Sequence, residues 1–80
     1  MIEADLDGED IYLEKAIFPL RVGRYGRTGF CLVGGDDLTA VVLDDGGDEV
    51  FFKTEQGALR AATAFAFAAG VQPLRLIEGA

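Results

Sequence analysis

The chain has 80 residues, half of them hydrophobic, so we expect one small domain spanning residues 1–80 with a core of its own. One cysteine, Cys31, and no histidine exclude a disulfide framework and argue against a zinc or other transition-metal site of the usual ligand set. The net charge of −7 argues against nonspecific binding to nucleic acid or to anionic membranes.

The N-terminal segment, residues 1–9, alternates acidic and apolar residues only weakly, and we interpret it as a frayed acidic arm. The chain begins with acids, whereas a signal peptide begins with bases followed by an apolar run. No apolar run approaches the roughly 18 residues that a membrane-spanning helix needs. These features predict a cytoplasmic protein without membrane contact.

Short apolar runs separated by glycine-rich turns predict antiparallel strands in the first two thirds of the chain. Pro19 cannot donate to a strand ladder, so its strand should lie at a sheet edge or bend there. Residues 23–29 are expected to form a turn, and the DDGGD sequence at 44–48 is expected to close a hairpin over 39–53. The expected strands are 11–17, 18–22, 30–33, 39–43 and 50–53.

A single helix is predicted between Thr54 and Gly70, because both of its ends are marked. Thr54 is a good N-cap with an acid after it, Gly70 is suited to a left-handed C-cap, and Pro73 prevents the helix from resuming. A last strand is expected at 74–77. The sequence therefore predicts an α+β fold of two layers, with four to five short antiparallel strands and one helix, about 55–69, packed on one face.

Almost every face of this helix is apolar, which predicts that it is covered on more than one side. Its main stripe, which we assign to the sheet, consists of Ala58, Ala62, Phe65, Ala66 and Ala69. A second, flat stripe consists of Gly57, Ala61, Ala64 and Ala68, and Phe67 lies off the main stripe. Ala64 and Phe67 are therefore candidate partner-binding residues, although alanine is also simply the best helix former.

The sequence RVGRYGRTG at 21–29 repeats both arginine and glycine at every third position. Guanidinium groups bind phosphate or carboxylate, and an exposed tyrosine can stack on a base. The candidate binding residues are Arg21, Arg24, Tyr25 and Arg27, and we expect Arg24 and Arg27 to point away from the helix. In the alternative interpretation, the segment is a hairpin turn whose arginines pair with the chain's own acids. It lacks the lysine and hydroxyl of a Walker A loop.

The remaining motifs indicate no chemistry. The acids at 44–49 lack the ligand spacing of an EF-hand, so a solvated hairpin tip is expected there. Cys31 lies within an apolar run and is interpreted as a small buried residue, since the chain has no histidine to activate it. We therefore expect no catalytic residue, no metal and no cofactor.

Three functions are compatible with these features. The first is a small protein-interaction module without catalytic activity that binds another protein and self-associates as a homodimer. The second is a nucleic-acid-mimicking inhibitor of a nuclease or of a DNA- or RNA-binding protein, because residues 1–14 and 36–49 each carry six acids and no base. The third is a binder of small anions or single-stranded nucleic acid through residues 21–29.

Overall fold

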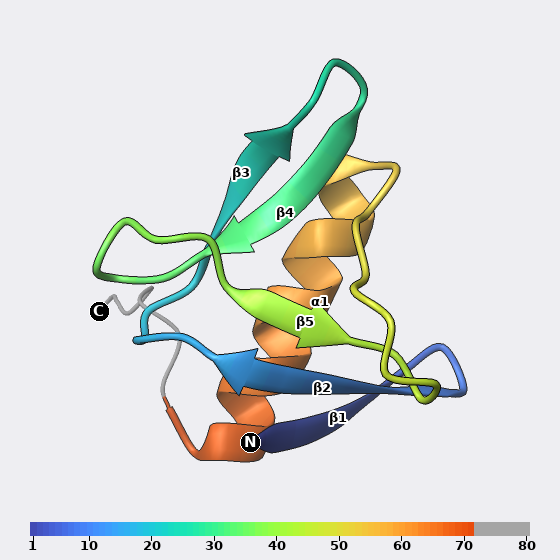
Figure 1. The fold of residues 1–80 in the computed structure, drawn as a ribbon. Helices are drawn as coiled ribbons and strands as arrows, with labels where there is room; N and C mark the ends of the chain where they lie inside the picture. The colour runs from blue at the N-terminus through green and yellow to red at the C-terminus, as the bar shows by residue number, and fades with distance from the viewer. Residues whose placement is uncertain (72–80) are drawn as a thin grey trace.

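A computed structural model describes residues 1–71, which contain five β-strands and one α-helix (Figure 1). The strands form a three-stranded antiparallel sheet in the order β1-β2-β5 and a two-stranded antiparallel sheet of β3 and β4, and the helix packs against both. The predicted α+β architecture is confirmed, but its strands divide into two sheets; the expected strand at 74–77 lies outside the described residues. The elements are β1 (Ile2–Leu6), β2 (Glu9–Lys15), β3 (Arg21–Tyr25), β4 (Gly29–Val33), β5 (Val41–Leu43) and α1 (Glu55–Ala69).

The N-terminal segment is a strand, and the prediction of a frayed arm is wrong for it. Strand β1 pairs with β2 along its whole length, from Ile2 opposite Leu13 to Leu6 opposite Glu9. Asp7 and Gly8 form the two-residue connection, and both have positive φ, 56° and 87°. An Asp-Gly pair in this conformation matches the right-handed twist of a hairpin. The segment is thus held by its own turn.

Strand β3 begins and ends later than the sequence predicts. It starts at Arg21, after a cis Phe18–Pro19 peptide bond, and it continues to Tyr25, so the turn is confined to 26–28. Gly23 lies within the strand, where a Cβ atom would come within 2.6 Å of the Val33 side chain. This glycine allows the two strands to pack closely and does not mark a turn. The turn that we predict from the repeated glycines therefore begins too early in the chain.

The predicted hairpin over 39–53 forms in part. The 44–48 loop is present, and the Asp44 carboxylate accepts hydrogen bonds from the backbone N–H groups of Gly46 and Asp48. The returning segment is not a regular strand, because Val50 donates to β5 whereas Phe52 exchanges hydrogen bonds with Phe30 of β4. It crosses from one sheet to the other and joins them.

Helix α1 has the predicted bounds and caps. The Thr54 hydroxyl accepts a hydrogen bond from the Gly57 N–H at 3.0 Å, and Gly70 has a φ of 74°. The left-handed conformation allows the N–H groups of Gly70 and Val71 to reach carbonyls of the last turn. The caps that the sequence predicts are therefore those that end this helix in the structure.

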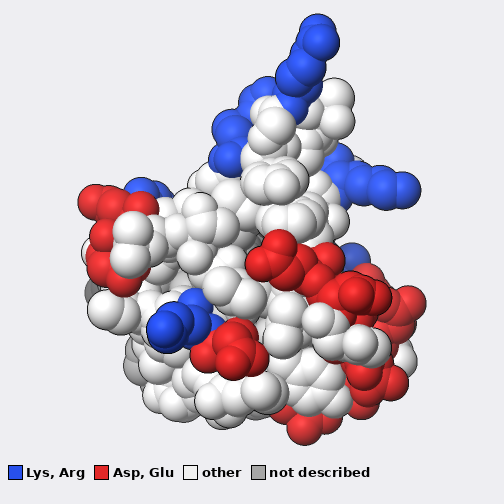
Figure 2. All heavy atoms as spheres, in the orientation of Figure 1, with Lys and Arg blue, Asp and Glu red and all other residues white. Residues whose placement is uncertain are grey.

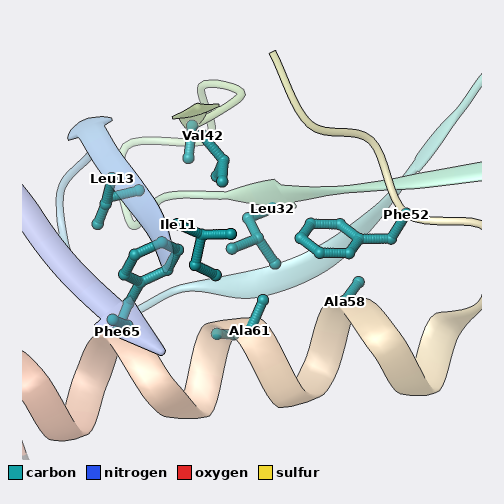
Figure 3. Close-up of a cluster of buried hydrophobic side chains, with 11 residues drawn as sticks. Ile11, Leu13, Leu32, Val42, Phe52, Ala58, Ala61 and Phe65 are labelled. Atoms are coloured by element: carbon teal, nitrogen blue, oxygen red, sulfur yellow. The ribbon is translucent and has the colours of Figure 1, made fainter. Parts of the chain in front are cut away.

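The core lies between α1 and the inner faces of the two sheets (Figure 3). Phe65 and Leu32 have the largest fully buried side chains. Strand residues alternate, so that Ile11 and Leu13 face the core while Tyr12 between them faces outward. The buried cluster is made of Ala4, Ile11, Leu13, Leu32, Ala40, Val42, Phe52, Ala58, Ala61, Ala62 and Phe65.

Candidate interaction surfaces

An apolar surface, which we call the outer helix face, lies on α1 away from the core. It consists of Leu59, Thr63, Ala64 and Phe67, and Phe67 is 86% exposed and Leu59 is 50% exposed. These four side chains line a hollow of about 480 Å³ together with Leu6 of β1 and the polar residues Gln56 and Arg60. Large exposed apolar side chains grouped in this way mark interaction sites on soluble proteins. Phe67 is off the buried stripe, as predicted.

The assignment of the alanines of α1 to its two stripes is wrong at two positions. Ala61, assigned to the partner side, has no exposed surface and belongs to the core, whereas Ala69, assigned to the sheet, is exposed. The reason is the shape of the inner surface: α1 contacts β1 on one side and both strands of the two-stranded sheet on the other. A helix between two sheets buries a wider face than one packed on a single flat sheet. Ala64 is half-buried and lies between the buried and the exposed face of α1.

Arg21 forms an ion pair and a hydrogen bond within its own chain. Its guanidinium group donates to the Asp37 carboxylate at 2.7 Å and to the Gly34 carbonyl at 3.2 Å. Both side chains remain largely exposed, at 56% and 79%, so the pair contributes little to stability. For Arg21, the alternative interpretation of the segment as self-paired is the better one.

Arg24 and Arg27 form no ion pair with any of residues 1–71. The Arg24 guanidinium donates to the carbonyl of Arg27 at 3.2 Å and lies 5.5 Å above the ring of Phe30. Phe30 packs against the core, so Arg24 lies on the inner side of the hairpin, and the expectation that it points away from the helix is wrong. Both arginines are nevertheless exposed.

Tyr25 stacks on Phe51, with ring centroids 3.9 Å apart and an angle of 6° between the planes. Gly29 is opposite Tyr25 in the β3–β4 ladder, and a Cβ atom there would come within 2.8 Å of the Tyr25 carbonyl oxygen. Both rings remain partly exposed, at 49% and 39%. They form one wall of a hollow of about 320 Å³ whose other walls come from residues 39–42, 49 and 50. The pair is a partly exposed aromatic platform on the face of the hairpin opposite to Arg24.

Parts of the two acidic stretches of the sequence meet at one end of the molecule, which we call the acidic end; Asp37 lies elsewhere, paired with Arg21. The acidic end comprises the β1–β2 turn and the 44–49 loop, and Asp7, Glu9, Asp44 and Glu49 line a common hollow there. Figure 2 shows this concentration of Asp and Glu atoms, with Lys and Arg atoms over the β3–β4 hairpin. The molecule is polarised, as the charge distribution in the sequence predicts.

Tyr12 lies beside the acidic end, and its hydroxyl donates to Asp45 at 3.5 Å. Partial burial, together with the charges of Glu3, Asp45 and Asp10, raises the pKa of the Tyr12 phenol above its ordinary value. Ionisation would place a further negative charge among carboxylates, which is why the neutral phenol is favoured.

Cys31 is buried, and its thiol points at the Arg24 carbonyl, 3.8 Å away. Within the described range, no group of three or more acidic or thiol side chains is arranged to hold a metal ion. In that same range, no helix is long and apolar enough to cross a membrane.

The six predicted site residues belong to two different surfaces. Ala64 and Phe67 lie on the outer helix face, whereas Arg21, Arg24, Tyr25 and Arg27 lie on the β3–β4 hairpin. Sequence reasoning missed Leu59 and Phe51 as exposed neighbours of these groups. Strand alternation could have identified Phe51, because a buried Phe52 turns the preceding side chain outward.

Comparison with protein-family models, with curated proteins and with solved structures finds no match.

Proposed function

We propose that this protein is a small cytoplasmic interaction module without catalytic activity, and that it self-associates through the outer helix face. The observation that carries this proposal is the exposure of Phe67, on the same side of α1 as Leu59. Moving phenylalanine and leucine side chains out of water is favourable, and the outer helix face groups two of them around a hollow.

The spacing on α1 suits a symmetric pair of helices. Leu59, Thr63 and Phe67 follow one another at four-residue intervals, so they lie in one row along the helix. If two copies cross in antiparallel orientation at Thr63, Phe67 of each copy meets Leu59 of the other. The central residues Thr63 and Ala64 are small enough for the helices to approach closely. Arg60, paired with Asp7 of its own chain, would stay at the rim.

Light scattering after size exclusion tests this proposal. We expect the wild-type protein at micromolar concentration to show twice the chain mass, and Phe67→Ser to show the single mass with unchanged secondary structure. Leu38→Ser is the matched control, because Leu38 is also a large hydrophobic residue and is 66% exposed on another surface; it should remain dimeric. A wild-type monomer at high concentration, or a dimeric Phe67→Ser variant, would overturn the proposal.

A second candidate function, a mimic of nucleic acid, is favoured by the convergence of the two acidic stretches. Asp7 and Glu9 come from one stretch and Asp44 and Glu49 from the other, yet they share one hollow. A basic groove on a DNA-binding protein could accept such a group of carboxylates. The test is competition between this protein and duplex DNA for an immobilised basic DNA-binding domain. Binding that duplex DNA does not displace would count against mimicry.

A further inference from the structure

Strand β1 is the outermost strand of the three-stranded sheet (Figure 1). Among residues 1–71 it pairs with β2 alone, so its other backbone edge has no partner strand in that range. From this edge and its surroundings, we infer that β1 binds an extended segment of a partner protein in which apolar and basic residues alternate. The segment would join the sheet as a further strand. The inference goes beyond the proposed dimer, which uses the helix and not the strand edge.

The first argument concerns the backbone groups that face this edge. The turn at 7–8 has two residues, so Leu6 and Glu9, which flank it, form a hydrogen-bonded pair. Hydrogen-bonded pairs alternate along an antiparallel ladder, so the N–H and C=O groups of Glu3 and Asp5 point away from β2. An extended segment beside β1 can therefore form hydrogen bonds with these backbone groups.

The second argument concerns charge on the face of the sheet that is turned away from the helix. Glu3 and Asp5 are exposed, and the ladder places Asp5 directly opposite Asp10 of β2. Like charges directly opposite each other destabilise a sheet. None of these three acids forms an ion pair with any of residues 1–71. A lysine or arginine on a strand next to β1 would lie beside Glu3 and Asp5 and offset this repulsion.

The third argument concerns the opposite face of the added strand. Side chains alternate along a strand, so the residues between the bases would lie on the same face as Leu6. Leu6 is half-buried and borders the hollow of about 480 Å³ that Ala64 and Phe67 also line. An apolar side chain next to β1 would reach this hollow from the strand side. Alternating apolar and basic residues therefore match both faces.

Charge separates such a partner from a second copy of β1. Two copies paired in antiparallel orientation around Ala4 would place Glu3 of each opposite Asp5 of the other. A shift of the register by two residues would instead place Glu3 opposite Glu3 or Asp5 opposite Asp5. Acids on an edge strand thus oppose pairing with another copy, whereas a segment with bases at these positions is attracted.

Fluorescence anisotropy with a short labelled peptide of alternating valine and lysine tests the inference. We expect saturable binding to the full-length protein, and weaker binding of a peptide with the same residues in two blocks. The variant E3Q/D5N should bind the alternating peptide roughly fivefold more weakly, because two cross-strand charge pairs are lost. D36N/D37N is the matched control, since it removes two acids from the loop between β4 and β5 and should bind as the wild type does.

A second pair of variants tests the backbone hydrogen bonds. Proline has no N–H group to offer to the free edge, and an edge strand accepts proline at such a position. Asp5→Pro should therefore bind roughly tenfold more weakly than Asp5→Asn, which keeps the N–H group. Circular dichroism checks that both variants are folded. An alternating peptide with N-methylated backbone makes the same test on the wild-type protein and should bind poorly.

Several outcomes would overturn the inference. Equal binding of the alternating and the block peptide would mean that charge alone explains the binding, and equal binding by E3Q/D5N and D36N/D37N would place the peptide away from β1. Undiminished binding of the N-methylated peptide would exclude strand addition. A full-length protein that does not bind would mean that a second copy or the chain's own C-terminal residues cover the edge.

The proposed dimer is tested separately from this site. Phe67→Ser, which removes the helix contact, should still bind the alternating peptide and should still lose affinity when E3Q/D5N is added. A dimer that fails to form in the wild type therefore leaves the edge of β1 as a binding site, and a peptide that fails to bind leaves the dimer untouched.

Discussion

Two phenylalanines of α1 that are only two positions apart have opposite roles. Phe65 is fully buried between the helix and the strands, whereas Phe67 is 86% exposed. We expect Phe65→Ala to lower the free energy of unfolding by about 3–5 kcal/mol, because a buried ring leaves a cavity. Phe67→Ala should change it by about 0.5 kcal/mol or less. Urea unfolding at dilute, monomeric concentration measures both, and equal losses would place Phe67 in the core.

Tyr12 makes the stability depend on pH in the alkaline range. Its pKa is raised above 10.0 in the folded state, so the unfolded chain releases this proton first as the pH rises. The contribution of Tyr12 is therefore complete below pH 10 and is lost as the pH rises through the raised value. We expect the free energy of unfolding to fall more between pH 9 and pH 11 in the wild type than in Tyr12→Phe. Parallel pH profiles for the two proteins would show that the phenol does not couple to folding.

Within the helix, the contribution of the N-cap of α1 to stability can be measured separately from that of the other helix residues. The Thr54 hydroxyl accepts the Gly57 N–H at 3.0 Å, and alanine would leave that donor without its partner. Thr54→Ala should therefore destabilise the protein by about 1 kcal/mol in chemical denaturation. Thr63→Ala is the matched control, because Thr63 is exposed within the same helix and alanine favours the helix there. A loss as large in the control would show that the cap is not the cause.

The β3–β4 hairpin should keep its fold without its two tip arginines. Arg24 and Arg27 are exposed, and exposed polar contacts contribute roughly 0–1 kcal/mol. We expect the melting temperature of R24Q/R27Q to be nearly that of the wild type. An unfolded double variant would instead show that the arginines clasp the hairpin to the rest of the protein.

For the molecule as a whole, the carboxylates of the acidic end repel one another. Glu9 of β2 and Glu49 of the 44–49 loop line the same hollow, and both are exposed. We expect E9Q/E49Q to raise the melting temperature by a few degrees, since about 1 kcal/mol shifts a domain of this size by roughly 4–8 °C. Glu14→Gln, which removes a charge elsewhere on β2, should have a smaller effect.

Salt provides an independent check of the same repulsion. At 1 M NaCl the Debye length falls to about 3 Å, so the gain from E9Q/E49Q should largely disappear. A gain of equal size at low and high salt would mean that the substitutions act by another route than charge.

The elements that could be predicted from the sequence are those whose signals are local. Thr54 and Gly70 set the ends of α1, because a cap needs only the residues of one turn. The loop at 44–48 was likewise predictable from its own acids and glycines. The hairpin of β1 and β2 was predictable from Asp7 and Gly8, although the acidic composition of 1–9 led to the wrong interpretation.

Contacts between distant segments could be seen only in the folded molecule. Ala61 is buried because α1 lies between two sheets, and no pattern within the helix specifies that second contact. The stacking of Tyr25 on Phe51 depends on the segment that crosses from β5 to β4, which joins residues 26 positions apart. The separation of an acidic end from a basic hairpin also depends on which distant segments pair. Charge and apolarity are encoded residue by residue, but their arrangement on the surface follows from the order in which the strands pair.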